Sequence, residues 1–206
     1  MIKAMTANRR FCPERSFNLT KMTSYILTTK RLGLRKWLDS DTQPFIEINK
    51  DTKVMKYFPK TLTEAETIEL VKRINLHFDK NNFGLFAVED KLTKQFLGFT
   101  GFAIPTFNAP FMPCVEIGWR YRSDVWGQGF ATEAARACLK YGFDTLNFDK
   151  VISFTSSINK ISEKVMQKIG MTFLTNFDHP KVETDSILCP HVLYQITKEQ
   201  FESSTK

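Results

Sequence analysis

Residues Ile117–Ala135 read IGWRYRSDVWGQGFATEAA, and they pass from a strand-like segment through a glycine-containing turn into a helix-like segment. The glycines of the turn, Gly127 and Gly129, let the backbone approach a ligand closely because they carry no Cβ. A helix start leaves several N–H groups without partners, and the helix dipole adds positive charge there. This stretch therefore predicts an anion site suited to a pyrophosphate.

Two common phosphate-binding motifs are excluded at this turn. No Lys-Ser or Lys-Thr pair follows the glycines, so the turn is not a Walker loop. Thr132 stands where the third glycine of a dinucleotide fingerprint would be, and no early βαβ unit precedes it. The glycine pair alone is a weak signal, because ordinary tight turns contain the same residues.

The composition indicates one globular domain. The chain has 206 residues with 42% hydrophobic residues, so it can bury a sizeable core and is neither disordered nor fibrous. No apolar run reaches the ~18–20 residues that cross a bilayer, so we expect no integral membrane protein. The net charge of +7 raises the question of an anionic partner: a nucleic acid, a membrane surface or a phosphate-rich small molecule.

The positive charge is concentrated at the N-terminus. Met1–Lys21 carries five basic residues against Glu14, a net +4, which leaves +3 for the rest of the chain. This segment lacks the apolar core of a secretory signal, and an organelle transit peptide is the alternative. We expect residues 1–21 to be a basic extension and residues 22–206 to form the single domain.

The cysteines and histidines form no cluster along the sequence. This scatter predicts neither a zinc site nor a disulfide framework, and therefore a reduced, cytoplasmic protein without a metal. The residues concerned are Cys12, Cys114, Cys138, Cys189, His77, His179 and His191.

Local patterns predict alternating helices and strands without an internal repeat or a domain boundary. Thr63 and Glu66 match a capping box, and small residues line one face of the helix predicted from Phe130 to Leu146. Asn159 is placed to cap a helix that ends at Gly170. Two further helices are predicted near 41–49 and 63–80, and the strands are predicted at Thr28–Trp37, Phe83–Val88, Phe96–Ile104, Val115–Tyr121, Val151–Ser156, Met171–Phe177 and Leu188–Thr197.

An ordered set of motifs resembles the GNAT superfamily of N-acetyltransferases, in particular its ribosomal-protein N-terminal (Rim-type) branch. The segment WGQGFATEA at Trp126–Ala134 resembles the family's acetyl-CoA pyrophosphate loop. Asp124 departs from the family, which has Arg or Gln at that position. The similarity spans roughly residues 26–203 and includes, in order, Thr29–Trp37 with Asp41, Val54–Pro59, Glu116–Trp119, Asn159 and Ser162 with Lys168–Gly170, and His191–Tyr194.

The resemblance implies a fold and a cosubstrate. The fold would be α+β in three α/β/α layers, with a mixed, mostly antiparallel sheet of about seven strands and about four helices. Acetyl-CoA would lie between two splayed strands, Val115–Tyr121 and Val151–Ser156, without a metal. The residues expected at the cofactor are Trp119, Tyr121, Arg122, Gly127, Gln128, Gly129, Phe130, Ala131, Thr132, Asn159 and Ser162.

Glu116 and Ser162 are the catalytic candidates. An attacking amine must lose a proton, and an N-terminal amine with a pKa of roughly 7.7–8.0 needs only a weak base. Glu116 lies on one face of its strand with Gly118 and Arg120, and it is the expected base; a structural carboxylate is the alternative. The helix after Asn159 lacks the Tyr that relatives use as an acid, so Ser162 or water would protonate the departing thiolate.

Several other residues have two interpretations each. His179 could border the acceptor, whereas a strand-end His191 would more commonly pair with the backbone. Tyr57 and Phe58 could line an acceptor cleft or pack in the core. The basic residues on the cofactor helices form either a solvated face or a contact with a 3′-phosphate; they are Arg136, Lys140, Lys164 and Lys168.

The sequence thus predicts an acetyl-CoA-dependent N-acetyltransferase that transfers acetyl directly to a primary amine, either a protein N-terminus or a small molecule. A non-catalytic acyl-CoA-binding module is the alternative, and a nucleic-acid-binding protein is suggested by charge alone. Binding to a membrane is not expected, and analogy with the family suggests a homodimer. The acceptor itself is not readable from the sequence.

Overall fold

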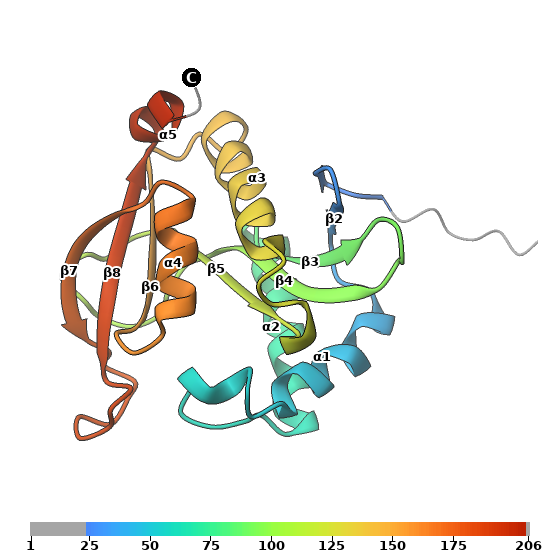
Figure 1. The fold of residues 1–206 in the computed structure, drawn as a ribbon, viewed down its shortest axis with the longest axis horizontal. Helices are drawn as coiled ribbons and strands as arrows, with labels where there is room; N and C mark the ends of the chain where they lie inside the picture. The colour runs from blue at the N-terminus through green and yellow to red at the C-terminus, as the bar shows by residue number, and fades with distance from the viewer. Residues whose placement is uncertain (1–23, 205–206) are drawn as a thin grey trace, which may run out of the picture.

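The computed structural model describes residues 24–204, which form one mixed sheet with helices on both faces (Figure 1). The predicted extension at residues 1–21 and Cys12 lie outside the described residues. Within 24–204 the sheet has eight strands in the order β1-β2-β3-β4-β5-β6-β8-β7. The strands are β1 (Leu27–Thr28), β2 (Leu32–Arg35), β3 (Leu85–Asp90), β4 (Phe96–Ala103), β5 (Glu116–Tyr121), β6 (Lys150–Ser156), β7 (Thr172–Asp178) and β8 (Pro190–Thr197).

Five α-helices occur within the same residues, together with three short 3-10 turns. All sheet neighbours pair antiparallel except β5 and β6, which are parallel. This arrangement confirms the predicted α+β fold. The helices are α1 (Thr42–Lys50), α2 (Glu64–Asn81), α3 (Phe130–Asp144), α4 (Lys160–Lys168) and α5 (Lys198–Ser204), and the 3-10 turns are η1 (Asp39–Asp41), η2 (Met55–Tyr57) and η3 (Ser123–Val125).

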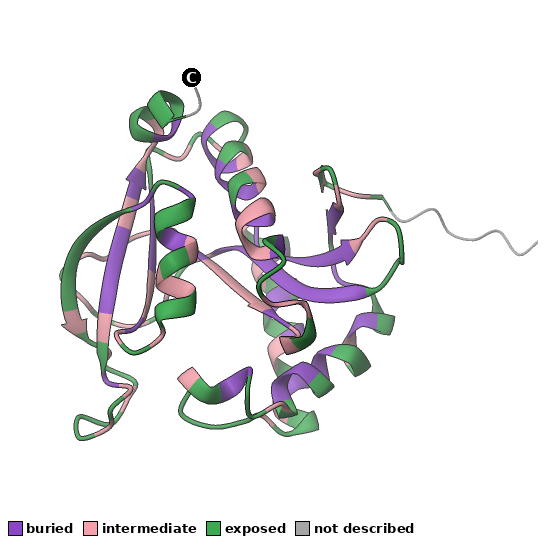
Figure 2. Ribbon diagram, in the orientation of Figure 1, coloured by how far each residue is buried: buried purple, intermediate pink, exposed green. Residues whose placement is uncertain are grey.

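The alternation of β4 shows which helices cover which face of the sheet. Phe99 points to the side of α1, where its ring lies 5.8 Å from that of Phe45. Phe102 points to the opposite side and contacts α3 where Gly142 provides the space, since a Cβ there would stand 2.7 Å from the Phe102 ring. The small-residue face predicted for α3 therefore permits close packing on the sheet. The inner strands β3 and β4 are buried, whereas the edge strand β7 is exposed (Figure 2).

Two elements differ from the sequence prediction. Thr28–Trp37 was expected as one strand, but it forms β1, a turn and β2, because Thr29 N–H donates to the Leu32 carbonyl at 2.9 Å and reverses the chain. The helix α5 was not predicted. Thr197 and Gln200 exchange hydrogen bonds there, so the Thr-x-x-Gln capping-box pattern carried a usable signal.

A buried ionic network joins β2 and β3 to the segment that precedes α1. Arg35 on β2 donates to Asp41 and to Glu89, and all three residues are at most 5% exposed. Two carboxylates on one guanidinium satisfy a charge that would otherwise be costly to bury. This network fixes where α1 starts, and α1 carries Asn49 to the neighbourhood of β5.

Candidate active site

The two parallel strands β5 and β6 diverge after a single contact. Glu116 and Ile152 form the only register pair between them in the described chain, where Ile152 N–H donates to the Val115 carbonyl at 2.9 Å. One step further, the Ser153 hydroxyl rather than a backbone amide bonds the Ile117 carbonyl at 2.9 Å. Beyond that point the strands open into a gap, as expected from the resemblance.

The edge of β5 that faces this gap includes the backbone N–H and C=O groups of Trp119. The carbonyls of Val115, Ile117 and Tyr121 all point away from β4, and the last accepts from Trp126 Nε1 at 3.0 Å. Because strand peptides alternate in direction, the N–H and C=O groups of Trp119 point to the same side. An extended ligand with amide groups could pair with them as a partial strand.

The N-terminus of α3 opens onto the wide end of the gap. Gly127 and Gly129 have φ angles of +79° and +82°, so both glycines adopt the left-handed conformation that the turn requires. The first intrahelical bond runs from Glu133 N–H to the Gly129 carbonyl at 3.0 Å. The amides of Phe130, Ala131 and Thr132 therefore lack helical acceptors, as the sequence predicts for this helix start, and we call this group of amides the cradle.

Arg31 braces this cradle, and sequence reasoning missed it. Its Nη1 donates to the Gln128 carbonyl at 2.9 Å, and its Nε donates to Glu133 at 2.6 Å. Its guanidinium carbon lies 4.2 Å from the centre of the Phe130 ring. Arg31 is about a hundred residues away from the loop in the sequence, so no local pattern could have indicated the contact.

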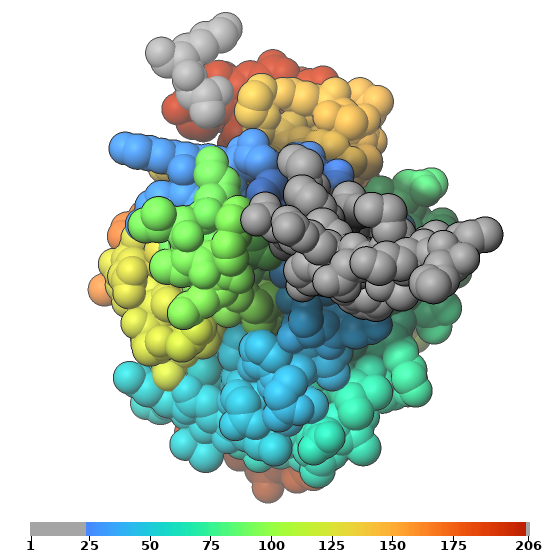
Figure 3. Space-filling model, turned by 90° about the vertical axis from the view of Figure 1, so that its right-hand side faces the viewer, coloured from blue at the N-terminus to red at the C-terminus, as the bar shows by residue number. Residues whose placement is uncertain are grey.

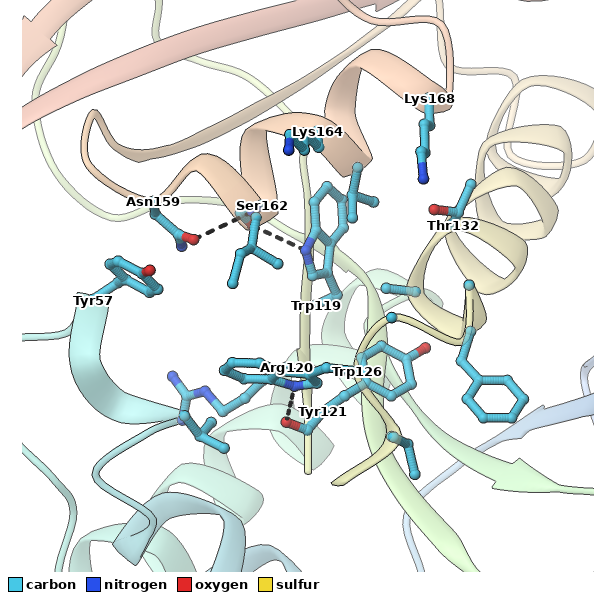
Figure 4. A pocket seen from close by; sticks show the side chains of 18 of the residues that line it. Tyr57, Trp119, Arg120, Tyr121, Trp126, Thr132, Asn159, Ser162, Lys164 and Lys168 are labelled. Carbon is cyan, nitrogen blue, oxygen red and sulfur yellow. Dashed lines mark hydrogen bonds between the residues drawn. The ribbon is translucent and has the colours of Figure 1, made fainter. Parts of the chain in front are cut away.

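A cavity of about 300 Å³ continues from the cradle through the gap, and it collects most of the predicted cofactor residues. Figure 4 shows Thr132 on one side of β5 and Tyr57 with Arg120 on the other, while α4 closes the top. Three predicted residues are not part of the lining: Glu116, Arg122 and Gln128. The predicted residues that line it are Trp119, Tyr121, Gly127, Gly129, Phe130, Ala131, Thr132, Asn159 and Ser162. Val54, Val125, Ile161 and Val165 add apolar walls that were not predicted.

Glu116 lies at the narrow end of the gap, on the α1 face of β5. Its carboxylate makes no hydrogen bond or ion pair with another residue in 24–204, and burial raises its pKa to about 8. The side chain is nevertheless only partly buried, and its Oε1 would lie 3.8 Å from a Cβ on Gly118, with nothing else within 4 Å. A carboxylate with a raised pKa therefore borders an open space over Gly118.

Ser162 is held at the opposite wall by two neighbours. Its backbone N–H donates to Asn159 Oδ1 at 3.2 Å, which confirms the predicted helix cap, and its hydroxyl accepts from Trp119 Nε1 at 3.0 Å (Figure 4). Because the indole N–H only donates, the hydroxyl proton of Ser162 is free to be given to another acceptor. The helix thus offers a hydroxyl where a Tyr is absent.

The other residues predicted on β5 and its turn have defined positions. Tyr121 is buried and shares a 2.7 Å hydrogen bond with Thr100, and burial raises the pKa of its phenol, so it stays protonated. Arg122 instead bonds Asp124 at 2.6 Å and reaches Gln95. The β3–β4 turn lies beside this loop at the surface (Figure 3).

The four basic residues of α3 and α4 were expected either to form a solvated face or to contact a phosphate, and they divide into two pairs. Lys164 and Lys168 line the cavity, whereas Arg136 donates to the Lys168 carbonyl at 2.6 Å and so ties the helices together. Lys140 pairs with Asp144 on the outer surface. Of these four basic residues, only Lys164 and Lys168 line the cavity.

The histidines lie outside the cavity. His77 is fixed between the Phe83 carbonyl and the Ile104 amide, and His191 Nδ1 bonds the Cys189 carbonyl at 2.9 Å. The ring centres of His179 and His191 lie 4.8 Å apart, and burial lowers the pKa of His179 to about 4. Both side chains belong to an aromatic cluster with Phe107, Phe111, Phe154 and Phe177.

Within residues 24–204, no group of three or more His, Cys, Asp or Glu side chains is placed to hold a metal ion. The three cysteines in this part of the chain are free thiols. None of the helices described here has the length and apolar character needed to cross a bilayer.

Comparison with known proteins agrees with the geometry. The family model for the acetyltransferase (GNAT) domain matches residues 31–172. The Bacillus subtilis protein YkkB is 35% identical over 148 residues, covering 71% of this chain and 85% of its own. The FsC-acetyl coenzyme A-N(2)-transacetylase of Aspergillus fumigatus is 30% identical over 186 residues, which cover 85% of this chain and 77% of that protein. A GNAT-family acetyltransferase structure from Bacillus anthracis is 28% identical, with a TM-score of 0.69. The match covers 84% of this chain and 98% of the Bacillus anthracis chain.

Proposed function

Because the chain belongs to the GNAT family of N-acetyltransferases, we propose that it transfers the acetyl group of acetyl-CoA directly to a primary amine. The observation that carries the proposal is one cavity that is lined by the start of α3, then by Trp119, and then, on the α1 face of β5, by Arg120. A pyrophosphate, an amide-containing arm and a reacting group would occupy these three places in that order.

The chain's own groups fit acetyl-CoA. The amides of Phe130, Ala131 and Thr132 would hold the pyrophosphate, and the peptide of Trp119 would hold the pantetheine amides. The bound cosubstrate would supply a thioester carbonyl that accepts the amine. The positive ends of Lys164 and Lys168 border the same cavity and would attract the phosphates.

Glu116 and Ser162 would handle the protons. Glu116 would accept a proton from the amine directly or through one water, and its pKa of about 8 is close to that of an N-terminal amine. The Ser162 hydroxyl, held by Trp119, would donate its proton to the sulfur as the thioester breaks. The two groups thus act from opposite sides of the gap.

Two finer assignments stay predictions. The resemblance to the ribosomal-protein branch depends on the order of motifs alone, and the homodimer depends on analogy.

The test uses the full chain and two measurements. Acetyl-CoA should raise the melting temperature, because a ligand that binds only the native state stabilises it, and amines should then release free thiol. Absence of any stabilisation at concentrations far above micromolar contradicts the proposal. Tight binding with no thiol release across amines, amino acids and peptides would instead favour the non-catalytic acyl-CoA-binding alternative.

A further inference from the structure

Arg120 is a partly buried cation without a carboxylate partner. It projects from β5 on the α1 face, the face that also carries Glu116 and Gly118, and it lines the cavity. No ion pair to Arg120 occurs among residues 24–204, and its Nε atom is buried with no hydrogen-bond acceptor. Burial lowers its pKa to about 10, which still leaves the guanidinium charged at neutral pH.

The surroundings of Arg120 hold the guanidinium in place without neutralising it. Asn49 Oδ1 accepts from Nη1 at 2.6 Å, and Asn49 is oriented in turn by a bond from its Nδ2 to Thr67 at 3.2 Å. The guanidinium carbon lies 4.2 Å from the centre of the Phe58 ring and 5.6 Å from that of Phe99. These rings attract the cation, but neither can occupy the hydrogen-bonding edge of the guanidinium.

The buried Arg35 differs from Arg120 because it has carboxylate partners. Arg35 binds both Asp41 and Glu89, so its charge is fully matched within the chain. Arg120 has one amide oxygen and aromatic rings in place of two carboxylates. A positioned guanidinium with free donors that faces a cavity is the usual arrangement for binding a carboxylate of a ligand.

We propose that Arg120 binds a carboxylate of the acceptor, and that the acceptor is therefore an amine that also carries a carboxylate, such as an amino acid. This inference rests on the proposed acetyl transfer. Glu116 and Arg120 are four residues apart on one strand face, so their Cα atoms are separated by about 13 Å with the open space over Gly118 between them. The amine would lie over Gly118 near Glu116, and the carboxylate would point toward Arg120.

The experiment compares matched acceptors in the thiol-release assay with the full chain. The twenty L-amino acids are assayed beside their amides, with phenethylamine and spermidine as amines without a carboxylate. Replacing the carboxylate of an amino acid by an amide lowers the pKa of its amine, so more of the amine is in the neutral, reactive form. If the amino acid is nevertheless the better acceptor than its amide, the enzyme must bind the carboxylate. We expect kcat/KM for the best acid to exceed that of its amide by about 10- to 100-fold.

Variants then assign the preference to Arg120. Arg120→Met should raise the KM for the acid by about 10- to 100-fold and remove the difference between acid and amide, whereas Arg120→Lys should restore part of it. Arg73→Gln, which changes an exposed arginine of α2, is the matched control and should behave as the unaltered chain. Melting curves in each case check that the variant is folded.

Three outcomes would overturn the inference while leaving acetyl transfer intact. They are equal or faster thiol release with the amides or carboxylate-free amines, no release with any carboxylate-bearing acceptor, and an Arg120→Met defect that appears in acetyl-CoA affinity instead of acceptor KM. Failure of the proposed function itself would appear separately, as absence of stabilisation by acetyl-CoA in the unaltered chain.

Discussion

The indole N–H of Trp119 donates to the hydroxyl of Ser162 at 3.0 Å, and this bond joins β5 to α4 across the opening between β5 and β6. The two residues are 43 positions apart in the sequence. The bond fixes both the wall of the cavity and the direction in which the Ser162 proton can be donated. The same bond therefore helps to set both the shape of the cavity and the position of the proposed proton donor.

Replacing Trp119 by Phe should remove this bond while keeping an aromatic ring. We expect the free energy of unfolding to fall by about 1 kcal/mol and acetyl-CoA affinity to weaken about fivefold, because α4 loses its tie to β5. Urea unfolding and calorimetric titration measure the two quantities. Trp37→Phe is the matched control: its indole N–H bonds the Leu85 carbonyl at 2.7 Å outside the cavity, so only stability should fall.

Replacing Glu116 by Gln should lower kcat by about 100-fold or more and leave acetyl-CoA affinity nearly unchanged. In the unaltered chain the rate should rise as pH passes through about 8, because the base is active only when deprotonated. The acceptor amine also titrates, so both proteins are assayed with one acceptor over the same pH range. Identical pH profiles would remove Glu116 from the role of base.

Glu116 should also affect stability with a defined sign. Its pKa is raised by burial from 4.5 to about 8, so between these values the folded chain keeps a proton that the unfolded chain has released. The contribution of Glu116 to stability therefore declines as pH rises from about 4.5 to 8, and this decline should be absent in Glu116→Gln. Unfolding free energies of both proteins across that range provide the measurement, and parallel curves would contradict the prediction.

Replacing Gly127 by Ala should weaken acetyl-CoA binding through the backbone alone. A Cβ at this position would have no neighbour within 4 Å, but φ is +79°, which costs a non-glycine residue about 1–2 kcal/mol. We expect about tenfold weaker acetyl-CoA binding as the loop amides shift. Gly118→Ala is the matched control, because φ is not positive there and its Cβ would meet only Glu116 Oε1, at 3.8 Å. This variant should keep stability and acetyl-CoA affinity but raise the KM for the acceptor.

Replacing Asp41 by Asn should destabilise the fold by about 3–5 kcal/mol, because the buried guanidinium of Arg35 loses a charge partner. Asp79→Asn is the surface counterpart, since Asp79 pairs with Lys36 where both side chains are more than 60% exposed, and it should cost less than about 1 kcal/mol. Chemical unfolding of the two variants in one buffer tests the difference. Similar losses would show that the network at Arg35 is not decisive for stability.

Features set by neighbouring residues could be predicted from the sequence. The capping box at Thr63 and Glu66 and the cap at Asn159 form as their spacing indicates, because each depends on atoms three residues apart. The same spacing at Thr197 and Gln200 would have predicted α5. The Thr28–Trp37 segment was misjudged because its turn depends on hydrogen bonds of Thr29 that strand alternation does not reveal.

The sequence by itself determined the glycine turn and the free amides at the start of α3, since Gly127 and Gly129 and the helix that follows fix the backbone locally. Only the tertiary structure decided what surrounds that cradle. Arg120 is an ordinary strand residue until Asn49, 71 positions away, and the rings of Phe58 and Phe99 position its charge beside a cavity. The physical reason is that helix starts and turns arise from contacts along the chain, whereas an unpaired buried charge is defined by groups that only folding brings together.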